Sequence, residues 1–460
     1  MKFNFLLISL FLISINQSFA QLPNQNTYLL RNLDNYSSYS ALWGYTAPNG
    51  REYAILGTNT GTSFVDITDS ANIHEVDFLT GLNSSWREMK TYSHYAYIVS
   101  EAASSRLQIV DLQYLPDSVS LVRTWNYTGY DHTHSISQEG NFLYLNGGNA
   151  TPGGTSAGGV AIVDVTDPVN PVKRGQWALK YVHDCRVQND TIWAANISNQ
   201  RVTVISAVNK DNPLEITFFN NLPNPSPHNC AITRDRKYLL VTDENTTPGK
   251  LKVWNIQDLS NITYVTSWQP TNITTTIVHN VEIYGDYAVI AHYASGIRIV
   301  NISNPAMPVE VAWYDTRPVD NVNNYTGCWG VYKFPSGKII GSDISNGLFV
   351  IKTTFSMTGI SNNNVLPESF SLSQNYPNPF NPSTNIKFTI NKNSFVKLNI
   401  INMQGKVVAN VINDVRDGGS YEILFDANRF GISSGTYFYK LEVENSSNKF
   451  SETKKMILIK

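Results

Sequence analysis

The chain has 460 residues with nearly balanced charge, 34 basic against 36 acidic. No clustered basic face is visible, which excludes the electrostatic footprint of a nucleic-acid-binding protein. The three cysteines, Cys185, Cys230 and Cys328, are an odd number, so the chain is not a disulfide-stapled scaffold. We interpret them as small buried apolar residues.

The first 20 residues have the pattern of a secretory signal peptide. Lys2 supplies the positive start, residues 5–15 are mostly apolar, and Ser18 and Ala20 give the small-x-small pattern before Gln21. No other apolar run approaches the 18 residues of a membrane helix, so we expect no transmembrane span. The mature chain is therefore predicted to be exported.

A repeat of 43 to 51 residues runs through the chain up to residue 354. The first apolar run of each repeat begins with Trp or His. A second run and a third run, such as Ile109-Val-Asp111, follow it in every repeat, and a fourth run follows in the repeats before the seventh. Four short strands per repeat of 40–50 residues are typical of a β-propeller blade. The seven repeat starts are Trp43, Trp86, His134, His183, His228, His279 and Trp329.

The two ends of the repeat region predict how the propeller closes. The seventh repeat has three runs and ends at Ile351 and Lys352, whereas an additional strand-like run at residues 27–33 precedes the first repeat. If the N-terminal run supplies the missing outer strand, the ring closes without an unpaired edge. We therefore predict an all-β fold whose first domain, residues 21–354, is a seven-bladed β-propeller.

The remaining sequence has a different texture. We assign residues 355–366 to a polar linker and residues 367–460 to a small Ig-like β-sandwich of several short strands. Its motifs are Tyr-Pro-Asn-Pro-Phe at residues 376–380, Gly-Thr-Tyr-Phe-Tyr at residues 435–439 and a last strand that ends in Lys460. Together they resemble the type A C-terminal sorting domain of the type IX secretion system of Bacteroidetes. A carbohydrate-binding or spacer sandwich is the alternative.

This resemblance implies transport by the type IX machinery to the outer cell surface of a diderm bacterium, removal of the tail and attachment to surface lipopolysaccharide. The repeats in turn resemble the LVIVD repeats, through Ile109-Val-Asp111 and Ile162-Val-Asp164. Over residues 25–354 the His-led strands resemble the choice-of-anchor B surface proteins. That family implies a propeller on a variable anchor but no particular activity.

Four histidines begin the first strands of consecutive blades, which places them near one mouth of the central channel: His134, His183, His228 and His279. The second strand of each blade runs antiparallel to the first and ends at the same mouth. Glu101, Glu244 and His292 are among the residues at these strand ends. We expect Trp43, Trp86 and Trp329 at this mouth in the other three blades. Imidazole and carboxylate groups together suit a transition metal, so these seven His and Glu residues are the candidate ligands. Structural histidines that bond to the neighbouring blade are the alternative.

Fold alone does not decide function, because propellers serve both as enzymes and as binding platforms. The first hypothesis is a secreted or surface-displayed binding or scaffold module, with an unidentified extracellular ligand and a metal at the channel mouth. The second is a metal-dependent hydrolase or oxidoreductase that uses the same mouth as its active site. No catalytic residue is assigned from the sequence, and neither a Gly-x-Ser-x-Gly elbow nor a His-Glu-x-x-His motif is present.

Overall fold

The computed structural model describes residues 24–357, except 247, 272, 274 and 319–323, and residues 370–459, except 391–393, 417–418 and 445–448. The predicted signal peptide and residues 358–366 of the predicted linker lie outside the described residues. Within them, strands dominate, and the helical segments are two short 3-10 turns, Ile197–Asn199 and Ala427–Phe430. No described helix is long and apolar enough to cross a membrane.

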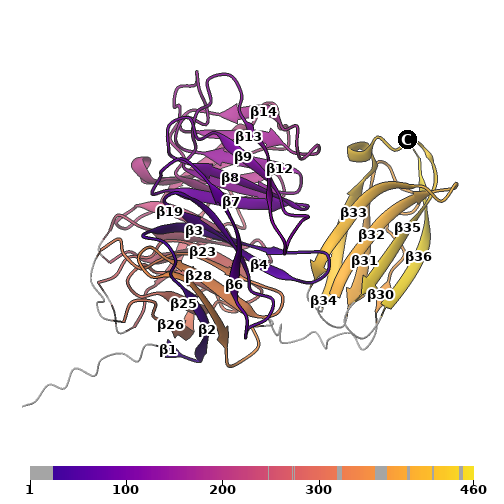
Figure 1. Ribbon diagram of the computed structural model, residues 1–460. Coiled ribbons are helices and arrows are strands. Elements are labelled where there is room, and N and C mark those ends of the chain that lie inside the picture. The colour runs from indigo at the N-terminus through magenta and orange to yellow at the C-terminus, as the bar shows by residue number, and fades with distance from the viewer. Residues whose placement is uncertain are drawn as a thin grey trace, which may run out of the picture.

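The described residues up to Thr353 form seven β-sheets, which are the blades of the propeller (Figure 1). In each blade, four strands follow one another from the channel outward. Blades 1 to 3 contain β3 (Tyr39–Thr46), β4 (Glu52–Thr58), β5 (Gly61–Asp66) and β6 (His74–Thr80); β7 (Arg87–Tyr92), β8 (Tyr95–Ser100), β9 (Leu107–Asp111) and β10 (Ser120–Trp125); and β11 (Ser135–Glu139), β12 (Phe142–Asn146), β13 (Val160–Asp164) and β14 (Val172–Trp177).

Blades 4 to 7 continue the same order. They contain β15 (Asp184–Gln188), β16 (Thr191–Asn196), β17 (Arg201–Ser206) and β18 (Leu214–Asn220); β19 (Pro227–Ile232), β20 (Tyr238–Asp243), β21 (Leu251–Asn255) and β22 (Thr263–Trp268); β23 (Val281–Tyr284), β24 (Tyr287–Ala291), β25 (Ile297–Asn301) and β26 (Val309–Tyr314); and β27 (Cys328–Lys333), β28 (Lys338–Asp343), β29 (Gly347–Thr353) and β2 (Thr27–Leu33).

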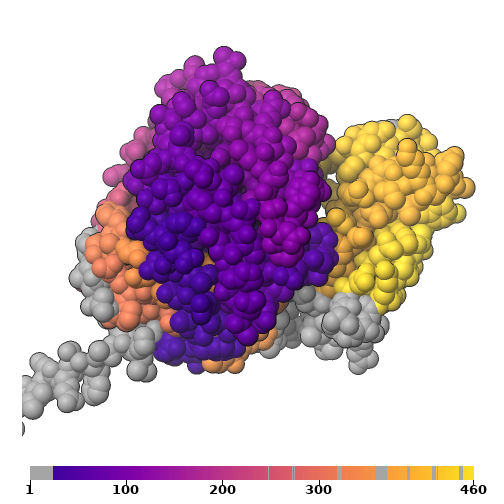
Figure 2. Space-filling view, in the orientation of Figure 1, coloured from indigo at the N-terminus to yellow at the C-terminus, as the bar shows by residue number. Residues whose placement is uncertain are grey.

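The ring closes as the sequence predicts. β2 pairs antiparallel with β29 and becomes the outer strand of blade 7. The innermost strands contact one another in turn around the channel, and β27 contacts β3. Figure 2 shows the consequence at the surface, where indigo N-terminal atoms lie against the orange atoms of the last blades. The seven-bladed propeller is confirmed.

One strand was not predicted. β1 (Asn24–Gln25) pairs with Tyr314 and Trp313 at the outer edge of blade 6, so this sheet has five strands. The N-terminal segment thus joins two blades, since β1 extends blade 6 and β2 completes blade 7.

The apolar core lies between the blades. Leu143 and Val163 of blade 3 pack in one cluster with Tyr97 and Ile109 of blade 2, and similar clusters join other neighbouring blades. Because both faces of each sheet are covered, the strands are apolar runs and not simple alternations. The three cysteines are free and buried within this core, as expected.

The C-terminal strands form two further sheets, drawn in orange to yellow in Figure 1. One contains β30 (Ser371–Leu372), β31 (Ser383–Ile390) and β34 (Gly419–Asp426), and the other contains β33 (Val407–Arg416), β32 (Ser394–Asn402), β35 (Gly435–Glu444) and β36 (Lys449–Leu458). Alternate residues such as Ile386, Leu398 and Leu441 enter one shared core. Two sheets around a single core are a β-sandwich, in agreement with the prediction.

Candidate functional site

Four imidazoles lie side by side at one mouth of the channel, and we call His134, His183, His228 and His279 the histidine arc. Their ring centroids are 4.0, 4.4 and 4.3 Å apart in chain order. The arc lines a cavity of about 20 Å³ together with Trp86 and Trp329.

The blade geometry places these histidines alike. The backbone N–H groups of His134, His183 and His279 each donate to a carbonyl near the end of the second strand of the same blade, at 2.9–3.0 Å. Because this bond recurs, successive imidazoles enter the mouth at the same level. The sequence prediction that the four side chains come together thus agrees with the geometry.

One expectation for this mouth is wrong. Trp86 and Trp329 line the mouth cavity, but Trp43 does not, and Ala41 takes its place. Trp43 lies in the middle of β3 and borders a second cavity farther along the channel, where the Lys90 ammonium sits 3.9 Å from its ring centroid. Ala41 lies two residues before Trp43, so aligning the first repeat by residue type shifts its register.

Hydrogen bonds fix the tautomers at both ends of the arc. Nδ1 of His134 lies 2.6 Å from a Glu101 carboxylate oxygen, and Nδ1 of His279 lies 2.5 Å from the carbonyl oxygen of Trp329. An ionised carboxylate and a carbonyl only accept, so each Nδ1 carries the proton and donates it. In a neutral imidazole the opposite nitrogen, Nε2, then presents a lone pair.

The two Nε2 atoms lie close to other polar groups of the mouth. Nε2 of His134 lies 3.1 Å from Nε2 of His183. Nε2 of His279 lies 3.8 Å from one oxygen of Glu244, and Nε2 of His228 lies 3.6 Å from the other. In addition, Nδ1 of His228 is buried without a hydrogen-bond partner among the described residues. The contact between the lone pair of His279 and the Glu244 carboxylate is unfavourable unless a proton or a cation lies between them.

The electrostatic environment keeps most of the arc neutral. Burial, followed by the charge of neighbouring histidines, lowers the pKa of His228 and of His279 to about 3. The same causes hold the pKa of His183 well below its ordinary value. For His134, burial acts to lower the pKa, but the hydrogen bond to Glu101 together with the charges of Glu101, Glu88 and Asp184 outweighs it, and the pKa is raised. Neutral imidazole is the form that binds metal.

The distances suit a metal ion. Candidate ligand atoms of His183, His228 and Glu244 all lie within 4.8 Å of one another. A zinc ion about 2.0–2.1 Å from each of two nitrogens separates them by roughly 3.3 Å in tetrahedral geometry. The 3.1 Å between His134 and His183 is close to this value. The hydrogen bonds that Nδ1 of His134 donates to Glu101 and Nδ1 of His279 donates to Trp329 are also of the kind that orients metal-binding histidines.

His292 is placed differently from the other candidates. It is buried, and its Nδ1 lies 3.3 Å from the Thr276 hydroxyl while its ring lies edge-on to Trp268. None of its contacts among the described residues is with the histidine arc. The candidates that the structure brings together are therefore the arc, Glu101 and Glu244.

The sequence did not indicate Tyr293, which donates a 2.6 Å hydrogen bond to Glu244 and packs its ring 4.6 Å from that of His279. Its φ of 32° lies in the left-handed region, which costs a non-glycine residue about 1–3 kcal/mol. Paired backbone bonds with Cys328 hold it there. Strained residues of this kind gather at functional sites, but no sequence periodicity marks them.

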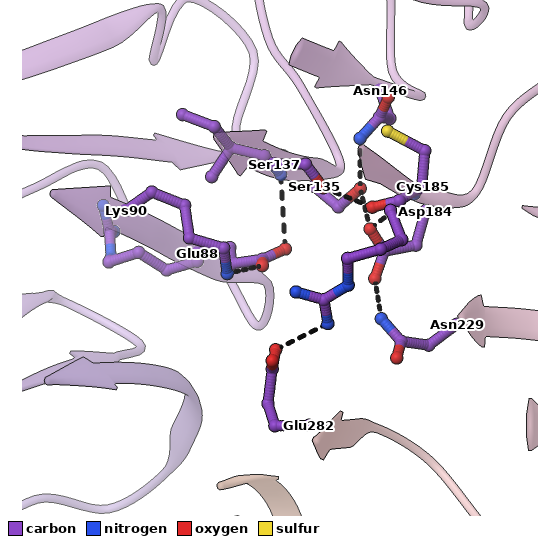
Figure 3. A network of polar contacts seen from close by, with 12 residues as sticks. Glu88, Lys90, Ser135, Ser137, Asn146, Asp184, Cys185, Asn229 and Glu282 are labelled. Atoms are coloured by element: carbon purple, nitrogen blue, oxygen red, sulfur yellow. Dashed lines mark hydrogen bonds and ion pairs between the residues drawn. The ribbon is translucent and has the colours of Figure 1, made fainter. Parts of the chain in front are cut away.

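Beneath the arc, a network of paired polar groups lines the channel (Figure 3). Arg186 pairs with Glu282 at 2.7 Å, Lys90 pairs with Glu88 at 2.8 Å, and Asn229 donates to Asp184. Burial and the charge of Glu88 raise the pKa of Asp184 to about 6. Because most of these charged groups are paired with one another, we expect the network to form a rigid base beneath the mouth.

Two family models match parts of the chain. Residues 374–460 match the secretion system C-terminal sorting domain, and residues 277–316, which cover blade 6, match the LVIVD repeat. The chain carries a type IX sorting domain behind an LVIVD-repeat propeller. The sorting domain indicates secretion or display on the outer cell surface, and it implies interaction with the type IX machinery. Membership of the choice-of-anchor B proteins stays a prediction.

Solved structures share the propeller fold with this chain. The periplasmic gluconolactonase of Pseudomonas aeruginosa aligns at a TM-score of 0.50 and 11% identity, covering 84% of this chain and 99% of that one. A protein from Lactobacillus plantarum aligns at 0.50 and 8% identity, covering 80% and 96%. Likeness at this identity shows the fold alone. No curated protein matches the sequence.

Proposed function

We propose that this protein is a secreted or surface-displayed binding module that holds a transition-metal ion at the mouth of its propeller. His183, His228 and Glu244 are the central ligands, and Nε2 of His134 and of His279 complete the set. The observation that carries the proposal is the lone pair of His279 Nε2, which faces one carboxylate oxygen of Glu244 at 3.8 Å while Nε2 of His228 lies 3.6 Å from the other oxygen. A cation at their centre turns these unfavourable contacts into ligand bonds.

The size of the mouth favours binding over catalysis. A cavity of about 20 Å³ accommodates a single ion or water molecule. A metal-dependent hydrolase or oxidoreductase acting at the same place needs room for its substrate beside the metal. The proposal therefore places the metal in a structural or ligand-presenting role. Attachment to surface lipopolysaccharide, which the resemblance implies, and an unidentified extracellular ligand belong to this proposal as well.

Metal analysis of the mature chain tests the proposal. After dialysis against zinc and then against metal-free buffer, we expect about one zinc ion per chain, and much less for His183→Ala with His228→Ala. His74→Ala is the matched control, because His74 is exposed at the outer strand β6 and bonds only to the Asn72 carbonyl. Equal zinc content in the double variant and the parent chain would refute the assignment.

A further inference from the structure

A third, larger cavity lies between blades 1 and 2. Its volume is about 410 Å³, which is within the range of small-molecule sites. The end of β6 and the loop after it form one wall, and β7, β8 and the β8–β9 loop form the other. Arg87 contributes both to this cavity and to the channel mouth.

Arg87 differs from the other buried basic residues. Its exposed fraction is 3%, yet no carboxylate among the described residues forms an ion pair with it. The other buried basic side chains all have an acidic partner: Lys90 with Glu88, Arg201 with Glu215, Lys252 with Asp243, Arg298 with Glu310 and Lys338 with Glu52. Burial alone lowers the pKa of Arg87 to about 10, so the group stays charged at neutral pH.

The guanidinium group is fixed in place. Nε donates to the Thr58 carbonyl at 3.3 Å and one terminal nitrogen, Nη2, donates to the Leu82 carbonyl at 2.6 Å. A Cβ on Gly81 would lie 2.7 Å from the other nitrogen, Nη1, so glycine leaves the space that the guanidinium occupies. Nη1 has no acceptor among the described residues. One terminal nitrogen of the charged group thus keeps no acceptor, while the rest of the guanidinium is fixed by hydrogen bonds.

Further polar groups lie beside it. Ser100 pairs directly with Arg87 across β7 and β8, so both side chains are on the same face of blade 2. The Ser100 hydroxyl is buried and has no hydrogen-bond partner among the described residues. Arg106, Gln108 and Thr124 line the same cavity, and Leu82 gives it an apolar part. The cavity thus has a charged end, several neutral donors and an apolar wall, and these features define the chemistry of the ligand that it fits.

We propose that this cavity binds a small hydroxylated organic carboxylate. The carboxylate accepts from Nη1 of Arg87, Arg106 adds positive charge at the exposed rim, and Gln108 and Thr124 bond the ligand hydroxyls. The ligand thereby supplies the counter-charge that Arg87 lacks. This site does not depend on the proposed metal, because none of the candidate metal ligands lines the cavity.

Calorimetry on the full mature chain, with a chelator present, tests this inference. The probes are sodium D-glucuronate, neutral D-glucose and inorganic sulfate at equal ionic strength. We expect glucuronate to bind, and glucose and sulfate each to bind at least about 10-fold more weakly. Glucose lacks the carboxylate that accepts from the charged Arg87, and sulfate lacks the hydroxyl groups that contact Gln108 and Thr124. Absence of glucuronate binding at about 10 mM overturns the proposal, as does equal binding of glucose. Equal binding of sulfate overturns the carboxylate assignment.

Variants locate the binding. Arg87→Met should weaken glucuronate binding at least about 10-fold. Since this change can also disturb folding, Thr124→Trp, which fills the cavity from an exposed position, should abolish binding in a folded chain. Arg123→Gln is the control, because Arg123 precedes Thr124 on β10 but bonds to Asn170 outside the cavity. Unchanged binding in Thr124→Trp, or equal loss in Arg123→Gln, overturns the location.

Discussion

Thr27, the first residue of β2, pairs with Thr353, the last residue of β29, so the two ends of the propeller sequence form one sheet. The Thr27 hydroxyl also donates to the carbonyl of Trp313 in blade 6 at 2.5 Å. A single N-terminal segment thereby fastens two neighbouring blades. Its removal should affect the whole ring, because each blade depends on its neighbours for burial.

Deletion of residues 21–34 should therefore cause aggregation and lower the melting temperature. The deletion leaves the edges of β26 and β29 unpaired, and exposed edges pair with other chains. By contrast, residues 21–354 alone should form a soluble monomer. Size-exclusion chromatography and thermal unfolding of both truncated chains measure these effects. Unchanged solubility and melting temperature after the N-terminal deletion would contradict the closure argument.

A pair of point variants refines this test. Leu33→Ala should lower the free energy of unfolding by about 1–2 kcal/mol, because Leu33 packs against the core cluster between blades 7 and 1. Leu29→Ala, on the same strand, should change it by less than about 0.5 kcal/mol, because Leu29 is 41% exposed. Equal effects would show that β2 contributes only its backbone pairing.

The blade count and its closure followed from the sequence because each blade repeats the same four runs. The two-residue strand β1 could not be predicted, since Asn24 and Gln25 carry no pattern of their own. The same holds at the mouth. Periodicity brings the four histidines together, but Tyr293 reaches Glu244 from the neighbouring blade through one irregular φ. The missing partner of Arg87 likewise becomes visible only when the blades are packed.

Tyr293→Phe should weaken zinc binding about 10–100-fold, because the hydroxyl that orients the Glu244 carboxylate is lost. Tyr325→Phe is the matched control, because the Tyr325 hydroxyl donates to Asn245, the residue that follows Glu244 in the chain, at 3.0 Å. Competition with a chromophoric chelator gives the affinities, and the visible spectrum of the cobalt form reports the geometry of the site. Identical affinity and spectrum in Tyr293→Phe would rule out a positioning role.

Removal of residues 367–460 should retain the protein in the periplasm of a type IX-competent host. The reason is that this segment contains the matched sorting domain, whereas the propeller closes without it. Cell fractionation and surface labelling measure the distribution. A chain lacking only residues 21–34 serves as a control for loss of folding, since it keeps the sorting domain. Surface display of the tailless protein at the parent level would refute the prediction.

Acid should destabilise the metal-free propeller partly through His292. Burial and then the charge of Arg298 lower the pKa of His292 to about 3 in the folded state, against about 6.5 in an unfolded chain. The unfolded state therefore binds a proton below pH 6.5 that the native state does not bind until about pH 3. The stabilising contribution is complete above about pH 6.5 and is lost as the pH falls.

The loss amounts to about 1.4 kcal/mol per pH unit below 6.5, or about 2 kcal/mol at pH 5. Urea unfolding of the parent chain and of His292→Gln at pH 7 and pH 5, with a chelator present, measures it. The fall in unfolding free energy should be smaller by about this amount in the variant. His74→Gln should follow the parent chain, because His74 is exposed on β6. If His292→Gln loses as much stability as the parent chain between the two pH values, His292 is not buried in its neutral form.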